Sequence, residues 1–369
     1  MGIAKPQPEV SSGEITPGPH VSGERSPLRV IQIGPFQLIQ ARPLREFKIP
    51  ALRRIQVEPL RMIQIALGLG WLADGLLQFQ PFMFSPDFLQ VMAGNAQGQP
   101  GMVHQAILGL VALAVSARVF FNACFALVQV AIGLGLIVSR RTVKPALVLS
   151  FGWTLVVWWA GEGLGMLFTG KASPLTGAPG AVLLYALIGL LVWPAARVPG
   201  TTASPAAVRD LAGRVAWGFL WLLLAGLMLL PANSAPDAMS GVFSAAASSM
   251  RAGPLAALNS ALAALTAGHG LLASVIAAGI MAEVGVMVLV DWHRKVALVA
   301  GAAIGVFIFL TSEFLGGILT GQGTDPNSGP LLVLLAALLW VGPLSSTPRL
   351  PFRWLPAPAS RELRQVHHA

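Results

Sequence analysis

Long apolar segments, separated by short polar ones, run through most of the chain. The longer segments approach or exceed the roughly 20 residues that an α-helix needs to cross a bilayer. The pattern predicts eight membrane-spanning helices, over residues 61–83, 116–139, 146–168, 180–196, 214–231, 268–290, 296–319 and 329–343. The chain is therefore expected to be an all-α integral membrane protein.

The apolar stretch 102–139 is long enough to contain two spans. Two spans would move every later basic loop to the opposite side of the membrane, whereas one span preserves their alternation. We therefore expect an outer helical segment over 102–117 followed by one span, with 255–267 as the counterpart. The sequence leaves open whether these two segments are re-entrant or extend the helix that follows.

The apolar pattern also repeats. The decamer GEGLGMLFTG, residues 161–170, returns as SEFLGGILTG, residues 312–321, with five of ten positions identical. Three further matches occur in the same order: residues 71–81 with 221–231, residues 129–141 with 283–295, and Pro179 with Pro330. Each copy would contain four spans, an even number, so both copies would have the same orientation. The sequence predicts eight transmembrane helices as two parallel, tandem four-helix-bundle repeats.

Composition and charge support a membrane location. The chain is 55% hydrophobic and 11% charged, with a net charge of +9. Lys and Arg gather in every second loop, as in cytoplasmic loops of membrane proteins, and not in a stripe interleaved with aromatic residues as nucleic-acid binding would favour. We expect lipid as a partner, no nucleic acid, both termini in the cytoplasm and a bacterial plasma (inner) membrane.

The polar segments suggest domain boundaries. Residues 1–27 are rich in Pro, Gly and Ser, a composition typical of disorder. The predicted divisions are a disordered or basic cytoplasmic segment 1–60, a first membrane unit 61–197, a cytoplasmic linker 198–213, a second membrane unit 214–343 and a cytoplasmic tail 344–369.

Glycine, tryptophan and basic residues recur at fixed places in both units. They are Gly68, Trp71, Gly75, Gln129, Gly133, Arg140 and Arg141 in the first unit, and Gly218, Trp221, Glu283 and Arg294 in the second. This layout resembles the DoxX/DoxD-like superfamily of four-helix membrane proteins, here as a tandem duplication over about residues 60–343. The resemblance implies four-helix-bundle units, a bound quinone and a redox partner protein, because no residue of the chain can supply electrons.

Three charged residues in apolar segments are candidate catalytic residues: Glu162, Asp74 and Arg118. Charged groups inside a membrane are costly and commonly face a cavity or a partner. We expect an Asp74–Arg118 ion pair, with Arg118 donating hydrogen bonds to a ligand carbonyl and Glu162 exchanging a proton. Alternatively, the pair fixes helix register, and Glu162 lies at the water boundary, capped by the Gly-rich loop that follows.

Five other polar residues in the apolar segments are candidate binding residues: Asn122, Gln129, His269, Glu283 and Glu313. The first unit holds more of these groups than the second, which suggests that one unit kept a site while the other became scaffold. His269, in a Gly-His-Gly setting, is also consistent with a polar residue at a helix end. No metal site is expected, because no histidine has metal-ligand spacing.

No motif of a self-contained enzyme occurs in the sequence. The preferred hypothesis is a DoxX-like membrane subunit, at most part of a quinone-linked oxidoreductase. Two alternatives remain: a transporter of a small solute or ion, and a non-catalytic membrane scaffold or assembly protein. The transporter hypothesis is weakened by the lack of an obvious broken helix in the sequence. The oligomeric state is left open.

Overall fold

The computed structural model divides the chain into two units, Met1–Gln56 and Val57–Ala369. It describes residues 28–33, 36–41, 58–194 and 204–341. The predictions for residues 1–27, for the start of the linker and for the tail 344–369 lie outside these ranges.

The first unit contains a β-hairpin that the hydrophobic pattern did not predict. Strand β1 (Leu28–Ile33) pairs antiparallel with β2 (Phe36–Ala41), with Leu28 opposite Ala41 and Ile33 opposite Phe36. The strand sequences LRVIQI and FQLIQA each place two apolar residues together in the middle, which interrupts the apolar–polar alternation expected of a strand.

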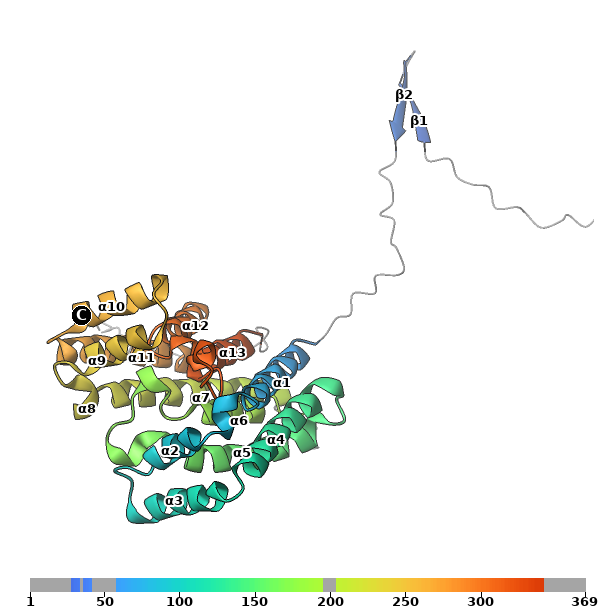
Figure 1. Ribbon diagram of the computed structural model, residues 1–369. Coiled ribbons are helices and arrows are strands. Elements are labelled where there is room, and N and C mark those ends of the chain that lie inside the picture. The colour runs from blue at the N-terminus through green and yellow to red at the C-terminus, as the bar shows by residue number, and fades with distance from the viewer. Residues whose placement is uncertain (1–27, 34–35, 42–57, 195–203, 342–369) are drawn as a thin grey trace, which may run out of the picture. The chain divides into compact units, whose positions relative to one another are not determined.

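The described part of the second unit is helical, and its two halves have the same order of elements (Figure 1). The first half has α1 (Pro59–Leu77), η1 (Pro81–Phe84), α2 (Pro86–Gly94), α3 (Gly101–Val115), α4 (Arg118–Val138), α5 (Val143–Val156), η2 (Val157–Gly161), η3 (Gly163–Thr169), η4 (Pro174–Thr176) and α6 (Ala181–Leu191). The second half has α7 (Pro205–Met228), α8 (Pro231–Ser234), α9 (Ala238–Ser249), α10 (Pro254–Thr266), α11 (Gly270–Leu289), α12 (Arg294–Leu310), η5 (Phe314–Thr320) and α13 (Ser328–Val341).

Within the described ranges, six helical segments are long and apolar enough to cross a membrane, so the chain is a multi-pass membrane protein. They are Pro59–Leu77, Arg118–Val138, Val143–Gly161, Pro205–Met228, Gly270–Leu289 and Arg294–Thr320. Helix α6 lies at the last predicted span of the first half, and α13 at the last predicted span of the second half. They have 11 and 14 residues. At 1.5 Å per residue they are about 16 and 21 Å long, shorter than a bilayer core of about 30 Å.

The segments 102–117 and 255–267 form separate helices, α3 and α10, as the next helix in each half starts after a break. Between α3 and α4 the break falls at Ala117, whose φ of −142° is not helical. Neither segment therefore continues straight into the helix that follows it.

Glycines let the main helix pairs approach closely. Helix α1 packs on α4, and α7 packs on α11 in the same way. A Cβ added to Gly133 would lie 2.8 Å from the carbonyl oxygen of Gly68, and one added to Gly285 would lie 3.2 Å from that of Gly218. Small residues at such crossings are typical of membrane helices, where packing rather than hydrophobic burial drives association.

The two halves pack together through their short helices. Helix α6 contacts α13, and each also contacts the first long helix of the other half: α6 packs on α7, and α13 packs on α1 (Figure 1). These reciprocal contacts are the pattern expected of two similar units that are related by a two-fold axis.

Buried positions give the register between the halves and correct one sequence match. The buried residues of α4 are Asn122, Ala126, Gln129, Ile132, Gly133 and Leu136, and those of α11 beyond its first residue, Gly270, are Ser274, Ala278, Met281, Val284, Gly285 and Val288. The two sets have identical spacing, so Gln129 corresponds to Met281 and not to Glu283. The apolar match had been displaced by two positions, because neighbouring aliphatic residues are interchangeable in such a comparison.

The prolines ahead of the short helices also correspond differently from the sequence match. The buried positions of α6 and α13 align from Ala181 with Ser328 onward, which pairs Tyr185 with Leu332. In this register Pro179 corresponds to Pro326, whereas Pro330 lies inside α13. The loop before α13 is therefore shorter than the loop before α6.

Helix ends divide the unit into two faces. The turn face carries the α4–α5 and α11–α12 turns, and the loop face carries the long segments after α5 and α12. Described basic residues of the turn face are Arg61, Arg140, Arg141, Lys144, Arg209, Arg214, Arg294 and Lys295, against Arg118, Lys171 and Arg251 at the loop face.

Two of the turn-face arginines stabilise helix ends. The Arg61 guanidinium donates hydrogen bonds to the Leu136 and Ile137 carbonyls of α4, at 2.7 and 2.6 Å. Arg214 does the same for Val288 and Leu289 of α11. A cation at a helix C-terminus satisfies carbonyls that have no partner within the helix.

Candidate functional site

Both copies of the decamer form a left-handed turn. Leu164, Gly165 and Met166 have φ values of 55°, 61° and 58°. Leu315, Gly316 and Gly317 have φ values of 62°, 65° and 66°. Consecutive left-handed residues are rare, because L-residues lose roughly 1–2 kcal/mol each in this conformation. The turn interrupts the regular helix within the predicted spans 146–168 and 296–319: α5 ends at Val156 and α12 at Leu310, and short 3₁₀ segments follow.

The repeated glutamate lies directly before each turn and caps the next short helix. Glu313 accepts hydrogen bonds from the Ser328 and Gly329 backbone N–H groups at 3.1 and 3.0 Å, and from the Ser328 hydroxyl. Glu162 accepts one from the Val182 N–H at 3.1 Å. The first N–H groups of a helix have no partner inside it, and an acidic group also matches the positive end of the helix dipole. Capping explains why the acid occurs in both halves.

A cavity of about 210 Å³ lies in the first half. Its polar lining includes Asp74, Gln129, Glu162, Tyr185 and Asp325, the last from the second half. Aromatic and aliphatic side chains form most of the rest: Trp71, Phe88, Val91, Met92, Leu110, Phe125, Trp153, Val156, Val157, Ala160 and Val182. We call it the deep cavity.

Asp74 and Tyr185 form the centre of this polar lining. The Tyr185 hydroxyl donates a hydrogen bond to Asp74 Oδ1 at 3.0 Å, and the Tyr185 and Trp71 rings lie 4.4 Å apart. Both side chains are almost completely buried. Tyr185, which sequence alone gave no reason to single out, thus joins α6 to α1 through a polar contact.

Several buried polar atoms around the deep cavity have no hydrogen-bond partner. They are the indole nitrogens of Trp71 and Trp153, and the side-chain oxygens Gln78 Oε1, Gln129 Oε1 and Glu162 Oε2. Most buried polar groups in proteins are paired with protein or ordered water, because leaving one unpaired costs about 1–3 kcal/mol. Two donors and three acceptors therefore remain available for a small polar group or water in the cavity.

The second half lacks this polar lining. In the burial register, Asp74, Gln129 and Tyr185 correspond to Leu224, Met281 and Leu332. Only the capping glutamate is present in both halves. The residues that differ between the halves, and not the one that repeats, therefore mark the candidate site.

The expected ion pair between Asp74 and Arg118 does not form. Asp74 is buried and bonded to Tyr185, whereas Arg118 is exposed at the start of α4 and donates to the Phe84 carbonyl at 3.1 Å. Arg118 is the first residue of α4, and its side chain bonds to the η1 segment and does not line the deep cavity. Arg118 is therefore removed from the site.

The other candidate residues lie in several places. Gln129 lines the deep cavity, and Asn122, about two turns away on α4, donates to the Gln78 carbonyl at 2.7 Å. His269 directly precedes α11 and contacts the Ala267 carbonyl, as expected of a helix-end residue. Glu283 is exposed on the outer side of α11, so it is not in the site. Glu313 lies in the second half as a helix cap.

Asp325 is a site residue that sequence reasoning missed. It lies in the segment Gly-Thr-Asp-Pro-Asn of the loop before α13. Its carboxyl accepts from the Asn327 N–H at 2.6 Å and from the Thr324 hydroxyl at 2.8 Å, a local Asp turn. Burial raises the pKa of Asp325 above the ordinary aspartate value, although these two hydrogen bonds oppose the shift. A polar residue before Pro was the only signal available.

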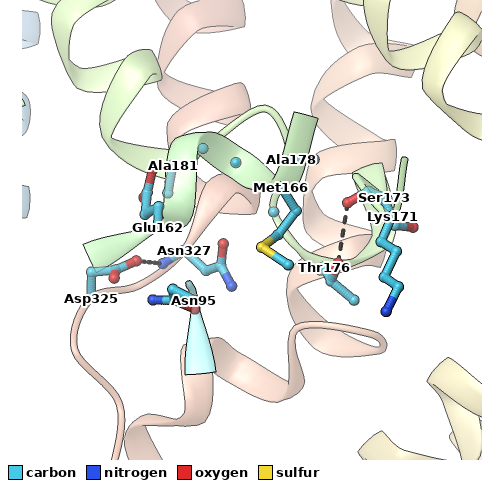
Figure 2. A pocket seen from close by; sticks show the side chains of 13 residues that line it. Asn95, Glu162, Met166, Lys171, Ser173, Thr176, Ala178, Ala181, Asp325 and Asn327 are labelled. Carbon is cyan, nitrogen blue, oxygen red and sulfur yellow. Dashed lines mark hydrogen bonds between the residues drawn. The ribbon is translucent and has the colours of Figure 1, made fainter. Parts of the chain in front are cut away.

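A second cavity, of about 240 Å³, opens at the loop face, and we call it the outer cavity (Figure 2). Its lining is mainly polar and backbone: Asn95, Glu162, Gly165, Met166, Lys171, Ser173, Thr176, Gly177, Ala178, Gly180, Ala181, Asp325 and Asn327. Figure 2 shows Glu162 and Asp325 at one end of it and Lys171 at the other.

No protein-family model matches the chain, and no curated protein and no solved structure matches it. Within residues 58–194 and 204–341, no group of three or more His, Cys, Asp or Glu side chains could hold a metal ion. Interpretation of the site therefore depends on its own chemistry: acidic and hydrogen-bonding groups on one side of an otherwise apolar cavity.

Proposed function

We propose that this protein is an integral membrane subunit whose first half binds a small amphipathic ligand of the quinone class for a membrane redox complex. It would consist of two parallel four-helix repeats of DoxX-like type, eight helices in all, with α6 and α13 as the fourth helix of each. The second half would serve mainly as scaffold.

The observation that carries the proposal is the unequal polar content of the two halves. Asp74, Gln129 and Tyr185 surround the deep cavity, and their counterparts in the second half are aliphatic or methionine. Polar groups buried at membrane depth are costly, so they are expected where they serve a ligand. A mostly apolar cavity with few polar groups is typical of small-molecule sites.

The lining residues suit a planar ring with carbonyl or hydroxyl groups. Trp71 and Trp153 offer unpaired N–H donors, Gln129 offers an amide, and aromatic walls can stack on a ring. A bound quinone would supply reversible uptake of two electrons and two protons. In this arrangement Asp74, through Tyr185, would hold a proton near the ligand, and electrons would come from a partner protein.

The charge distribution supports the proposed orientation. Basic residues predominate at the turn face, which is the pattern of a cytoplasmic surface. The turn face and both termini would then lie in the cytoplasm of a bacterium with this protein in its plasma membrane. The loop face and the outer cavity would face outward.

A second candidate, transport of a small solute, gains support from the backbone. Sequence showed no broken helix, but α5 and α12 both end in a left-handed turn and continue as short capped helices. Transporters often place substrates at such helix interruptions. The break follows a 19-residue segment, Val143–Gly161, so it lies near one membrane surface and not at the centre.

Ligand binding can be tested with substitutions taken from the second half. We expect Gln129→Met to reduce bound quinone about tenfold, since one hydrogen bond to a ligand is worth about 1–1.5 kcal/mol. The triple variant D74L/Q129M/Y185L should abolish binding. The measurement is quinone extracted and quantified after purification from native membranes in mild detergent.

Leu134→Met is the matched control, because it places the same residue on the lipid-facing side of the same helix. It should retain wild-type quinone. A purified wild-type protein without quinone, or equal quinone in the triple variant, would contradict the proposal. In that case, solute uptake into proteoliposomes would test the transport candidate.

A further inference from the structure

The outer and deep cavities adjoin each other. Four residues line both of them: Asn95, Glu162, Ala181 and Asp325. The other outer-cavity residues lie toward the loop face, and the other deep-cavity residues lie within the helix bundle. The shared residues therefore form the boundary between a polar space and an apolar one.

Two carboxyl groups at this boundary come from different halves of the chain. Glu162 follows α5, and Asp325 precedes α13. In the register of the short helices, Asp325 corresponds to Ala178 in the first half. The boundary of the deep cavity thus contains an acid that only the second half can supply.

Only part of Glu162 is used by its capping role. Its Oε1 accepts from the Val182 N–H, whereas Oε2 is buried without a partner. In Glu313, both carboxyl oxygens accept hydrogen bonds from the start of α13. The same residue is a complete cap in one half and a partly unsatisfied acid beside Asp325 in the other.

Acidic side chains outnumber basic ones around the boundary. Five titratable side chains line the two cavities: Asp74 from α1, Glu162 after η2, Tyr185 from α6, Asp325 from the loop before α13, and Lys171. Lys171 is exposed and lies at the far end of the outer cavity, where solvent screens it (Figure 2). Acidic groups in a narrow polar passage favour cations over anions.

We infer that the outer cavity is a cation-selective, water-filled route by which protons from the loop face reach the deep cavity, with Glu162 and Asp325 as its inner end. This inference rests on the proposed function for its purpose, because quinone chemistry needs a supply of protons. The route itself depends only on the cavities and their charges. It also gives the second half a role in the site of the first.

The test measures which charged reagents reach the boundary. In a Cys124→Ala background, which removes the only cysteine, Ala181→Cys places a thiol where both cavities meet. Cationic and anionic methanethiosulfonates of similar size are added to the loop face of the reconstituted protein. We expect the cationic reagent to react at least about tenfold faster, since tenfold corresponds to about 1.4 kcal/mol of attraction.

Removing one boundary charge should remove most of this preference. Asp325→Asn is expected to bring the two rates close together, whereas Asp87→Asn, an exposed change on α2, should preserve the difference. Leu127→Cys on the lipid-facing side of α4 should react with neither reagent. Asn95→Cys, also on the boundary, provides a second position in case Ala181→Cys fails to fold.

Changing pH provides an independent readout. A raised pKa means that Asp325 gains its proton, and loses its charge, at a higher pH than an ordinary aspartate. The cationic preference should therefore decline as pH falls, with a midpoint above the ordinary value, and this decline should be absent in Asp325→Asn. The other titratable side chains of the two cavities also contribute to the electrostatic potential at the thiol. The same pH series is therefore measured for Asp74→Asn.

Three outcomes would overturn the inference. Failure of both boundary thiols to react from the loop face would exclude a water-filled route. Equal preference in wild type and Asp325→Asn would exclude the acid pair. Sodium that protects the thiol better than choline at equal ionic strength would assign the route to a metal cation. None of these measurements uses quinone, so they succeed or fail separately from the ligand test.

Discussion

Replacing Gly165 with alanine is expected to destabilise the protein by at least about 3 kcal/mol. Gly165 has φ +61°, and a Cβ there would overlap the Pro179 carbonyl oxygen. That oxygen cannot easily move, because it accepts a hydrogen bond from the Trp158 indole at 2.8 Å. The change therefore combines left-handed backbone strain with a backbone collision. Thermal and denaturant unfolding in detergent would measure the loss.

Two other glycines provide the comparison. Gly316→Ala, at the same place in the second turn, should cost less, about 2 kcal/mol, since its Cβ would lie 2.7 Å from the Asp325 carbonyl oxygen. Gly152→Ala in α5 has no atom within 4 Å of the new Cβ and a helical backbone, so stability should stay the same or rise by up to about 1 kcal/mol. Equal stability of Gly165→Ala and Gly152→Ala would contradict the described turn.

The two capping glutamates should separate stability from ligand binding. Glu313→Ala removes the acceptor of three hydrogen bonds at the start of α13, and we expect it to cost about 2–4 kcal/mol. Glu162→Ala removes one recorded cap bond and should cost about 1–2 kcal/mol. Unfolding of both variants is compared with bound quinone after purification.

The expected pattern is a reversal between the two assays. Glu313→Ala should be the less stable variant but should keep its quinone when folded, whereas Glu162→Ala should be more stable and lose quinone. Ser328→Ala removes only the hydroxyl donor to Glu313 and should cost about 1 kcal/mol. Equal stability and equal bound quinone in the two glutamate variants would contradict the different roles assigned to Glu162 and Glu313.

Two of the long helices, α4 and α11, could be predicted closely from hydrophobicity, whereas α1 ends at Leu77 instead of 83 and α7 begins at Pro205 instead of 214. Helix α4 was expected over 116–139 and runs from Arg118 to Val138, and α11 was expected over 268–290 and runs from Gly270 to Leu289. They begin at Arg118 and Gly270, and a charged residue follows two positions after each end, at Arg140 and Asp291. The bounds of α3 and α10 agree with the expected segments within two residues, although the sequence left open whether these segments extend the next helix.

The turns could not be predicted from hydrophobicity. The residues after Glu162 and Glu313 are as apolar as the helices before them, so the spans seemed to continue. The left-handed turn depends on glycine at Gly165 and Gly316 and on the chain that crosses against them. Apolar patterns contain no information about the sign of φ, and the only signal was the unusual number of glycines.

The candidate site was predicted in part. Asp74, Gln129 and Glu162 were singled out because polar groups are rare in membrane helices, and all three line the deep cavity. Arg118 and Glu283 were singled out for the same reason but lie outside it. Composition identifies an unusual residue, but only the helix register decides which side of the helix it occupies. Asp325 was missed because polar residues are ordinary in loops.

The contact between α1 and α13 has a consequence for biosynthesis. Helix α1 leaves the ribosome well before α13, so these partners cannot meet until α13 has been synthesised. Asp325 enters just ahead of α13. Until then the nascent chain would expose an incomplete bundle, in which α1 lacks one of its packing partners, to insertion factors and membrane proteases. A premature stop just ahead of α13 would remove that helix and leave α1 without this partner.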